Sequence, residues 1–79
     1  MDKEKVASQI AQWIKENCQY AKDKTVKADS ELIDSGMLDS LDYLRLVSFI
    51  EESYGTEVDG DSMIPDNFRT PIAIAGLVN

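Results

Sequence analysis

The chain has 79 residues, which is the length of one small domain with a single modest core. Fifteen acidic residues against eight basic ones give a formal net charge of −7, so nucleic acids and anionic membranes are unfavourable partners. One cysteine, Cys18, and no histidine exclude an internal disulfide and a cysteine–histidine zinc site. We expect one cytoplasmic, monomeric domain over residues 1–79, without a signal peptide or membrane span, and we expect Cys18 to be a half-buried small hydrophobe.

The charge is unevenly distributed along the chain. Residues 1–27 hold six lysines against four acids, a balance of +2, whereas residues 28–79 hold eleven acids against two arginines, a balance of −9. Basic protein surfaces are therefore the natural partners of the second part.

The first predicted element is a helix from Asp2 or Lys3 to about Gln19. Its apolar residues recur at helical spacing and form one face, namely Val6, Ile10, Trp13 and Ile14. We interpret Trp13 as an anchor of the core rather than as a ligand platform.

From Ala21 to Leu38 no periodicity persists, which predicts a long irregular loop between the first two helices. Its apolar residues indicate that the loop folds back onto the helices: Val26, Leu32, Ile33, Met37 and Leu38. Asp34-Ser35-Gly36 is typical of a turn and comes just before the next helix.

The second predicted helix, Leu41 to Tyr54, has the clearest amphipathic pattern. Asp39 is a favourable N-cap, Asp42 adds negative charge to the first turn, and Ser40 lies at the start of the helix. Free N–H groups at such a position also favour a bound anion such as a phosphate ester. The core face is predicted to hold Leu46, Val47, Ile50 and Tyr54, and Gly55 is predicted to end the helix.

Leu41 and Leu44 fall on the polar side of this helix, among charged residues that include Glu51 and Glu52. Two leucines about one turn apart beside Ser40 indicate a small docking patch. Scattered exposed leucines are common, however, and an Asp-Ser-Leu sequence before an apolar run is also how an ordinary helix begins.

The rest of the chain predicts two shorter elements. Asp61 to Ile64 fits a single-turn helix that Pro65 stops, and Thr70-Pro71 is a helix start with an N-cap threonine. The final helix is predicted to be short and apolar, with Ile72, Ile74, Ala75, Leu77 and Val78. Without a strand pattern, the fold class is all-α: a small four-helix bundle of three main helices and one short helix.

The residue types argue against an enzyme. Ser40 has no histidine to serve as a base and no Gly-x-Ser-x-Gly elbow. Asp59-Gly60-Asp61 begins like a calcium loop, but Met63 and Ile64 occupy positions where that loop needs a ligand and a glycine. We expect neither catalytic residues nor a metal site.

Gly36-Met37-Leu38-Asp39-Ser40-Leu41 resembles the attachment site of the acyl and peptidyl carrier proteins. The resemblance covers about Lys3 to Val78 and is most specific from Asp34 to Glu52. It implies that a phosphopantetheinyl transferase attaches 4′-phosphopantetheine from coenzyme A to Ser40, and that the arm holds acyl or aminoacyl groups as thioesters. It also implies docking positions at Asp39, Leu41, Asp42, Leu44, Glu51 and Glu52.

Three positions depart from the fatty-acid-type members of that family, and one of them, Ser53, interrupts the acidic run that is usual there. Arg45 stands where they usually have an acid, and Ser48 where they often have an apolar residue. The segment Ile64 to Thr70 is similar to one in stand-alone carriers that work beside adenylate-forming ligases. This favours a discrete carrier of an aminoacyl or specialised acyl group. The partners that the resemblance implies are an adenylate-forming ligase or acyltransferase and synthase enzymes, and both possibilities stay open.

Fatty acid, polyketide and nonribosomal peptide pathways stay open. The alternative is a non-enzymatic helical adaptor in which Ser40 only caps a helix.

Overall fold

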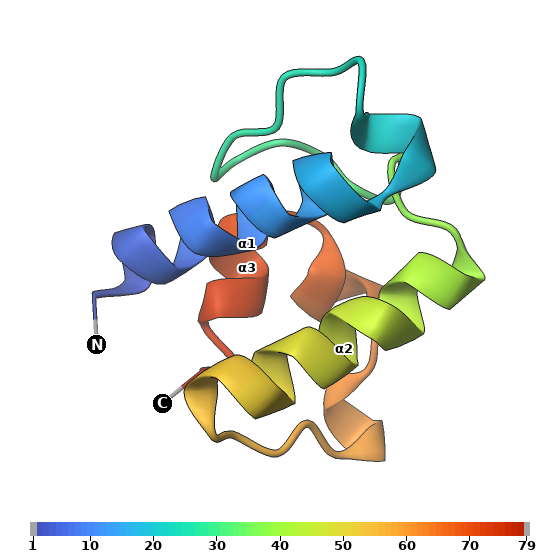
Figure 1. Ribbon diagram of the computed structural model, residues 1–79. Coiled ribbons are helices and arrows are strands. Elements are labelled where there is room, and N and C mark those ends of the chain that lie inside the picture. The colour runs from blue at the N-terminus through green and yellow to red at the C-terminus, as the bar shows by residue number, and fades with distance from the viewer. Residues whose placement is uncertain (1, 79) are drawn as a thin grey trace.

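A computed structural model describes residues 2–78, and every regular element in that range is helical (Figure 1). In chain order the elements are α1 (Lys3–Asn17), the 3₁₀ turn η1 (Gln19–Ala21), α2 (Ser40–Tyr54), the 3₁₀ turns η2 (Gly60–Ser62) and η3 (Pro65–Phe68), and α3 (Pro71–Ala75). The predicted all-α class is confirmed. The described residues contain three α-helices and three short 3₁₀ turns in place of the predicted bundle of four helices.

The helix α1 starts where the sequence predicts and ends earlier. Asp2 caps it, because its carboxylate accepts a hydrogen bond from the Glu4 N–H at 3.0 Å. The helix ends at Asn17 because Cys18 is extended, and η1 then turns the chain away. Its buried face holds Val6, Ala7, Ile10, Ala11 and Ile14.

The helices α1 and α2 run in opposite directions across the view of Figure 1, and α3 lies behind α1. The core lies between these three helices and is closed by residues of the connections. Its largest fully buried side chains are Phe68, Ile10, Ile14, Leu32, Leu46, Ile50 and Ile74. Tyr54, predicted as a core residue, is only half-buried, and its hydroxyl donates to Gln9 Oε1 at 2.6 Å.

The loop between α1 and α2 is irregular, as predicted, but it is tied to the rest of the fold. Leu32 N–H donates to the carbonyl of Arg69 at 2.8 Å, and Ile72 N–H donates to the carbonyl of Ala28, also at 2.8 Å. Leu32 is fully buried, whereas Ile33, which was also expected to pack, is 37% exposed. These two backbone hydrogen bonds join the loop to the segment that leads into α3.

The connection after α2 differs in part from the prediction. Gly55 ends α2 with a φ of 64°, a left-handed conformation that glycine adopts without steric cost. The single-turn helix expected at Asp61 to Ile64 is instead η2, capped by Asp59. Pro65 begins η3 rather than stopping a helix, because a first-turn residue needs no N–H donor.

The start of α3 is as predicted, with Thr70 Oγ1 accepting from Ala73 N–H at 3.1 Å and Pro71 as its first residue. The helix ends at Ala75, so Leu77 and Val78 lie beyond it. No helix among residues 2–78 is long and apolar enough to cross a membrane.

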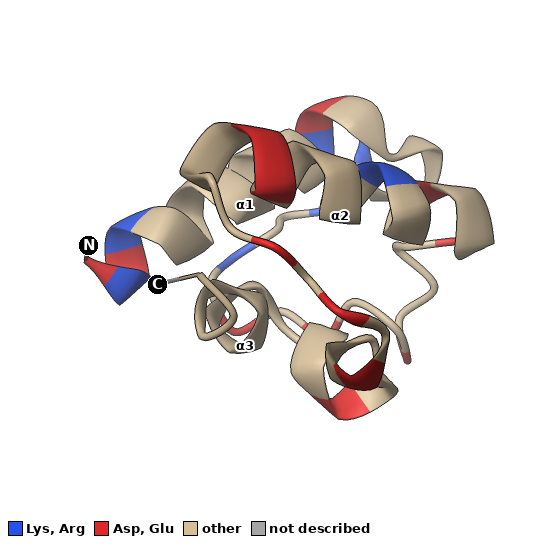
Figure 2. Ribbon diagram, turned by 90° about the horizontal axis from the view of Figure 1, so that it is seen from below, with Lys and Arg blue, Asp and Glu red and all other residues tan. Residues whose placement is uncertain are grey.

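The charged residues are also unevenly distributed over the fold. Figure 2 shows acidic residues from the end of α2 through the connection that follows it, and both basic and acidic residues on α1. The connection after α2 carries Glu57, Asp59 and Asp61 and no basic residue, whereas the charges on α1 are mixed.

Candidate functional site

Ser40 is the first residue of α2, and it is exposed. Asp39 precedes it in an extended conformation, and its Oδ1 accepts a hydrogen bond from Asp42 N–H at 2.8 Å. The carbonyl of Asp39 accepts from Tyr43 N–H at 3.0 Å, which closes the first turn. The predicted N-cap is confirmed, and the serine hydroxyl stands at the positive end of the helix.

The chain approaches Ser40 from a turn that is anchored on the core. Gly36 has a φ of 75°, and the next residue, Met37, is buried and donates its N–H to the carbonyl of Leu32 at 3.1 Å. Ser35, the other serine of an Asp-Ser pair, donates its hydroxyl to the carbonyl of Glu31. The position of Ser40 is therefore fixed from both sides, by Met37 before it and by α2 after it.

Leu41 and Leu44 are exposed, at 64% and 58%, whereas Leu46 on the same helix is fully buried. The predicted exposure of both leucines is thus confirmed. Their role in docking stays a prediction. On this helix the two leucines lie one turn apart and next to Ser40.

An open, mainly apolar depression of about 470 Å³ lies beside Ser40. It is lined by Ile33, Leu38, Asp39, Ser40, Tyr43, Leu44 and Met63. Sequence reasoning missed four of these residues as parts of the site: Ile33, Leu38, Tyr43 and Met63. Tyr43 could have been found, because residues three and four positions after Ser40 share its helix face.

Tyr43 forms the inner wall of the depression. Its ring lies 4.5 Å from the ring of Phe68, centroid to centroid, and burial raises the pKa of its phenol. This aromatic pair connects the depression to the fully buried core.

Asp42 requires a correction. It was predicted to lie on the docking surface, but it is only 4% exposed. Its Oδ1 lies 3.2 Å from the Arg45 guanidinium, and its Oδ2 has no hydrogen-bond partner among the described residues. The reason is geometric: at about 100° per residue, Asp42 is turned away from Leu41 and towards α1.

Arg45 connects this buried carboxylate to α1. Its guanidinium also donates to the carbonyl of Asn17 at 3.4 Å and lies 5.8 Å from the centre of the Trp13 ring. Arg45, which differs from the acid usual in fatty-acid-type carriers, thus contacts Asp42 on α2 and the end of α1. Trp13 itself is half-buried and stacks on Phe49, with 5.2 Å between ring centroids.

Glu51 and Glu52 lie at the other end of α2, roughly 16–18 Å along the helix from Ser40. Glu51 is half-buried, and its Oε2 accepts from Val58 N–H at 3.0 Å, so it helps to order the next connection. Glu52 is exposed. The structure does not bring either residue to the depression beside Ser40.

Cys18 is fully buried, deeper than the half-buried position predicted for it. Burial raises the pKa of its thiol to about 11, and the nearby Asp42 carboxylate adds to this effect. The thiol is therefore protonated and unreactive at neutral pH. Within residues 2–78, no cluster of three or more cysteine or carboxylate side chains is placed to hold a metal ion.

No protein-family model matches the chain, and no curated protein matches it either. Its fold does match a solved structure, the complex of Bradyrhizobium japonicum glycine:[carrier protein] ligase with glycylated carrier protein. The TM-score is 0.72 at 20% sequence identity. The match covers 96% of this chain and 97% of the matched chain in that complex. This chain therefore shares its small helical fold with a chain of that complex.

Proposed function

We propose that this chain is a discrete carrier protein that holds acyl or aminoacyl groups as thioesters on a 4′-phosphopantetheine arm attached to Ser40. The observation that carries the proposal is the exposed Ser40 hydroxyl at the first residue of α2, in a carrier-like fold. A helix cap needs only the Asp39 carboxylate, which already accepts from Asp42 N–H, so capping leaves the Ser40 hydroxyl without a function.

The surroundings of Ser40 fit such an arm. A phosphodiester on this hydroxyl meets the N–H groups and the positive dipole end of α2, which favour an anion. The apolar depression of Ile33, Tyr43, Leu44 and Met63 begins beside the attachment point, and it suits the hydrocarbon part of the arm.

Attachment requires a hydroxyl on this chain, and the catalytic groups belong to the transferase. The Ser40 oxygen bonds to the phosphorus that carries pantetheine, the pyrophosphate bond of coenzyme A breaks, and the nucleotide half leaves with that electron pair. The serine proton goes to a base of the transferase, which is why this chain needs no histidine. The arm supplies the thiol that carries the cargo.

The proposed docking surface lies around Ser40. Leu41 and Leu44 supply exposed apolar contacts, and Asp39 supplies negative charge beside them. Glu51 and Glu52 extend the acidic character along α2, so a partner with a basic rim around an apolar pocket is complementary.

A ligase that activates a carboxylic acid is the partner we propose for loading. A solved structural neighbour is a glycylated carrier protein in complex with a glycine:[carrier protein] ligase. By analogy, the arm thiol attacks the activated acyl carbon, the activating group leaves, and a thioester forms. The pathway and the identity of the cargo are set by that ligase.

Mass spectrometry after incubation with a promiscuous phosphopantetheinyl transferase and coenzyme A tests the proposal. The wild-type chain should gain the mass of one arm, and Ser40→Ala should gain none. Ser35→Ala and Ser48→Ala are matched controls and should be modified like the wild type. A wild-type chain that stays unmodified supports the adaptor alternative, and an arm on Ser40→Ala disproves the assignment of Ser40.

The buried cysteine provides an independent readout of the same reaction. In the native unmodified protein, the protonated and fully buried Cys18 thiol should not react with a disulfide reagent at neutral pH. One reactive thiol per chain should appear after the arm is attached, and it should disappear again when a ligase forms the thioester.

A further inference from the structure

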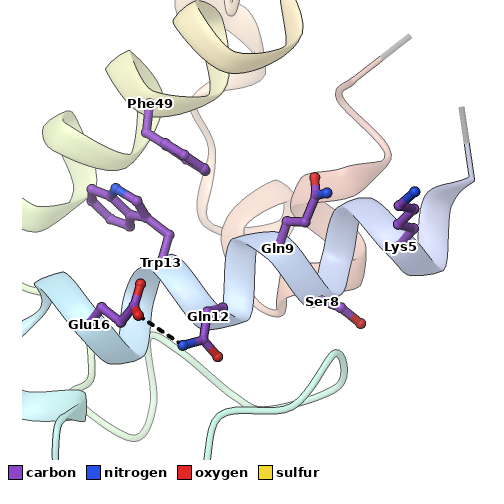
Figure 3. A pocket seen from close by; sticks show the side chains of 7 residues that line it. All are labelled: Lys5, Ser8, Gln9, Gln12, Trp13, Glu16 and Phe49. Carbon is purple, nitrogen blue, oxygen red and sulfur yellow. Dashed lines mark hydrogen bonds between the residues drawn. The ribbon is translucent and has the colours of Figure 1, made fainter.

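The exposed side of α1 carries a row of polar residues that the carrier function does not use. Lys5, Gln9, Gln12 and Glu16 lie within about 60° of arc on the helix, at about 100° per residue. All four are exposed, and Figure 3 shows them along α1 with Trp13 and Phe49 beside them. An open groove of about 440 Å³ runs along this row.

The side chains of this row are self-complementary: the row can pair with a second copy of itself that runs in the opposite direction. Lys5 and Glu16 are opposite charges at its two ends, and Gln9 and Gln12 are amides near its middle. The midpoint of both pairs falls between Ile10 and Ala11. When two such helices pack antiparallel about a twofold axis at that midpoint, Lys5 of each copy meets Glu16 of the other, and Gln9 meets Gln12.

The internal hydrogen bonds leave complementary groups on the two amides. Gln9 Oε1 accepts from the Tyr54 hydroxyl at 2.6 Å, which leaves the Gln9 amide N–H groups for a further acceptor. Gln12 Nε2 donates to Glu16 Oε2 at 3.0 Å, which leaves the Gln12 carbonyl oxygen for a further donor. A donor on one copy therefore faces an acceptor on the other.

We propose that two copies of this chain associate weakly through this face, with their α1 helices antiparallel. Trp13 and Phe49 give the contact an apolar part, because their stacked rings lie in the groove beside the row on the α2 side. A parallel pairing is disfavoured, because it would place Lys5 against Lys5 and Glu16 against Glu16.

The charge distribution selects this face over the others. Residues 1–27 have a net charge of +2, whereas residues 28–79 carry −9, so contacts through the second part would bring acidic surfaces together. The proposed face is also separate from Ser40 and its depression. The dimer replaces the monomer expected from the sequence, and it holds whether or not Ser40 is modified.

Sedimentation of the full chain over a wide concentration range tests the proposal. We expect concentration-dependent dimerisation of the wild type, accompanied by a change in the fluorescence of Trp13, the only tryptophan. Lys5→Glu or Glu16→Lys should each weaken association roughly tenfold, because two attractive pairs become two repulsive ones. Each substitution suits the dipole of its helix end, so the fold should persist, as circular dichroism can verify.

An experiment that mixes the two variants is the decisive test of the proposal. Lys5→Glu and Glu16→Lys should associate with each other, because both end pairs become attractive again in the mixed dimer. Lys22→Glu, which makes the same charge change on the exposed loop, is the matched control and should dimerise like the wild type. A wild type that is monomeric at every concentration, a mixture that does not associate, or a Lys22→Glu variant as weak as Lys5→Glu overturns the proposal.

Discussion

The two faces of α2 differ in what holds them in place. The inner face packs Leu46 and Ile50 at full burial and includes the buried Asp42 carboxylate. The outer face presents Ser40, Leu41 and Leu44 to solvent. One helix therefore both stabilises the domain and displays the serine. Because the outer leucines lack a core partner, substitutions on that face report on partners, whereas substitutions on the inner face report on folding.

The largest expected effect tests this division directly. Leu46→Ala removes a fully buried side chain and should lower the free energy of unfolding by about 2–5 kcal/mol. Leu44→Ala, at a position 58% exposed, should cost about 0.5 kcal/mol or less. Urea unfolding followed by circular dichroism measures both.

The same pair separates docking from folding. Leu44→Ala should slow modification by the transferase, or loading by the ligase, while its unfolding midpoint stays near that of the wild type. If Leu44→Ala unfolds the domain, and its activity only follows the folded fraction, Leu44 belongs to the inner face and the division is wrong.

Local signals predicted the starts of all three α-helices and the end of α2. Asp39 and Thr70 cap α2 and α3, and Gly55 ends α2, because capping depends on a few neighbouring residues. The exposure of Leu41 and Leu44 followed from helical periodicity, which is also local. These features needed no knowledge of how the helices pack.

Tertiary contacts decided the rest. Asp42 is buried because the end of α1 and Arg45 lie against it; periodicity within α2 turns Asp42 away from Leu41, but it does not specify the contact with α1. The depression beside Ser40 gathers Ile33 and Met63 from two different connections, whose approach depends on the whole fold. The prediction for Pro65 was wrong for a local reason, because proline can both stop and start a helical turn.

The second prediction concerns alkaline pH and the inner side of the fold. The pKa of Cys18 is raised to about 11 in the folded state from 9.0, so the folded state holds its proton more tightly than the unfolded state. The protonated Cys18 thiol therefore stabilises the folded state. This contribution to the free energy of unfolding is fully present below pH 9 and is lost as the pH rises to about 11, which lowers the free energy of unfolding by about 2–3 kcal/mol in total.

Cys18→Ala should reduce the fall in the free energy of unfolding between pH 9 and pH 11. Tyr43 and Tyr54, whose phenol pKa values are also raised by burial, remain in the variant and provide the background slope at higher pH. Unfolding free energies at several pH values between neutrality and pH 11 measure the difference. Parallel curves for the two proteins would show that the Cys18 thiol is accessible to water in the folded state.

The smallest expected effect compares two ion pairs of the same spacing. Asp42–Arg45 and Asp66–Arg69 are both three residues apart, but the Asp42 side chain is 6% exposed and the Asp66 side chain 77% exposed. Arg45→Ala leaves a buried carboxylate without its partner and should cost about 1–2 kcal/mol, whereas Arg69→Ala should cost about 0.5 kcal/mol or less. Salt should reduce the second cost further and barely change the first, because a buried pair is screened less. Thermal unfolding of both variants at low and physiological ionic strength measures these costs. Equal costs for the two arginines would mean that water reaches Asp42, and the inner face of α2 would then be no more protected than the outer one.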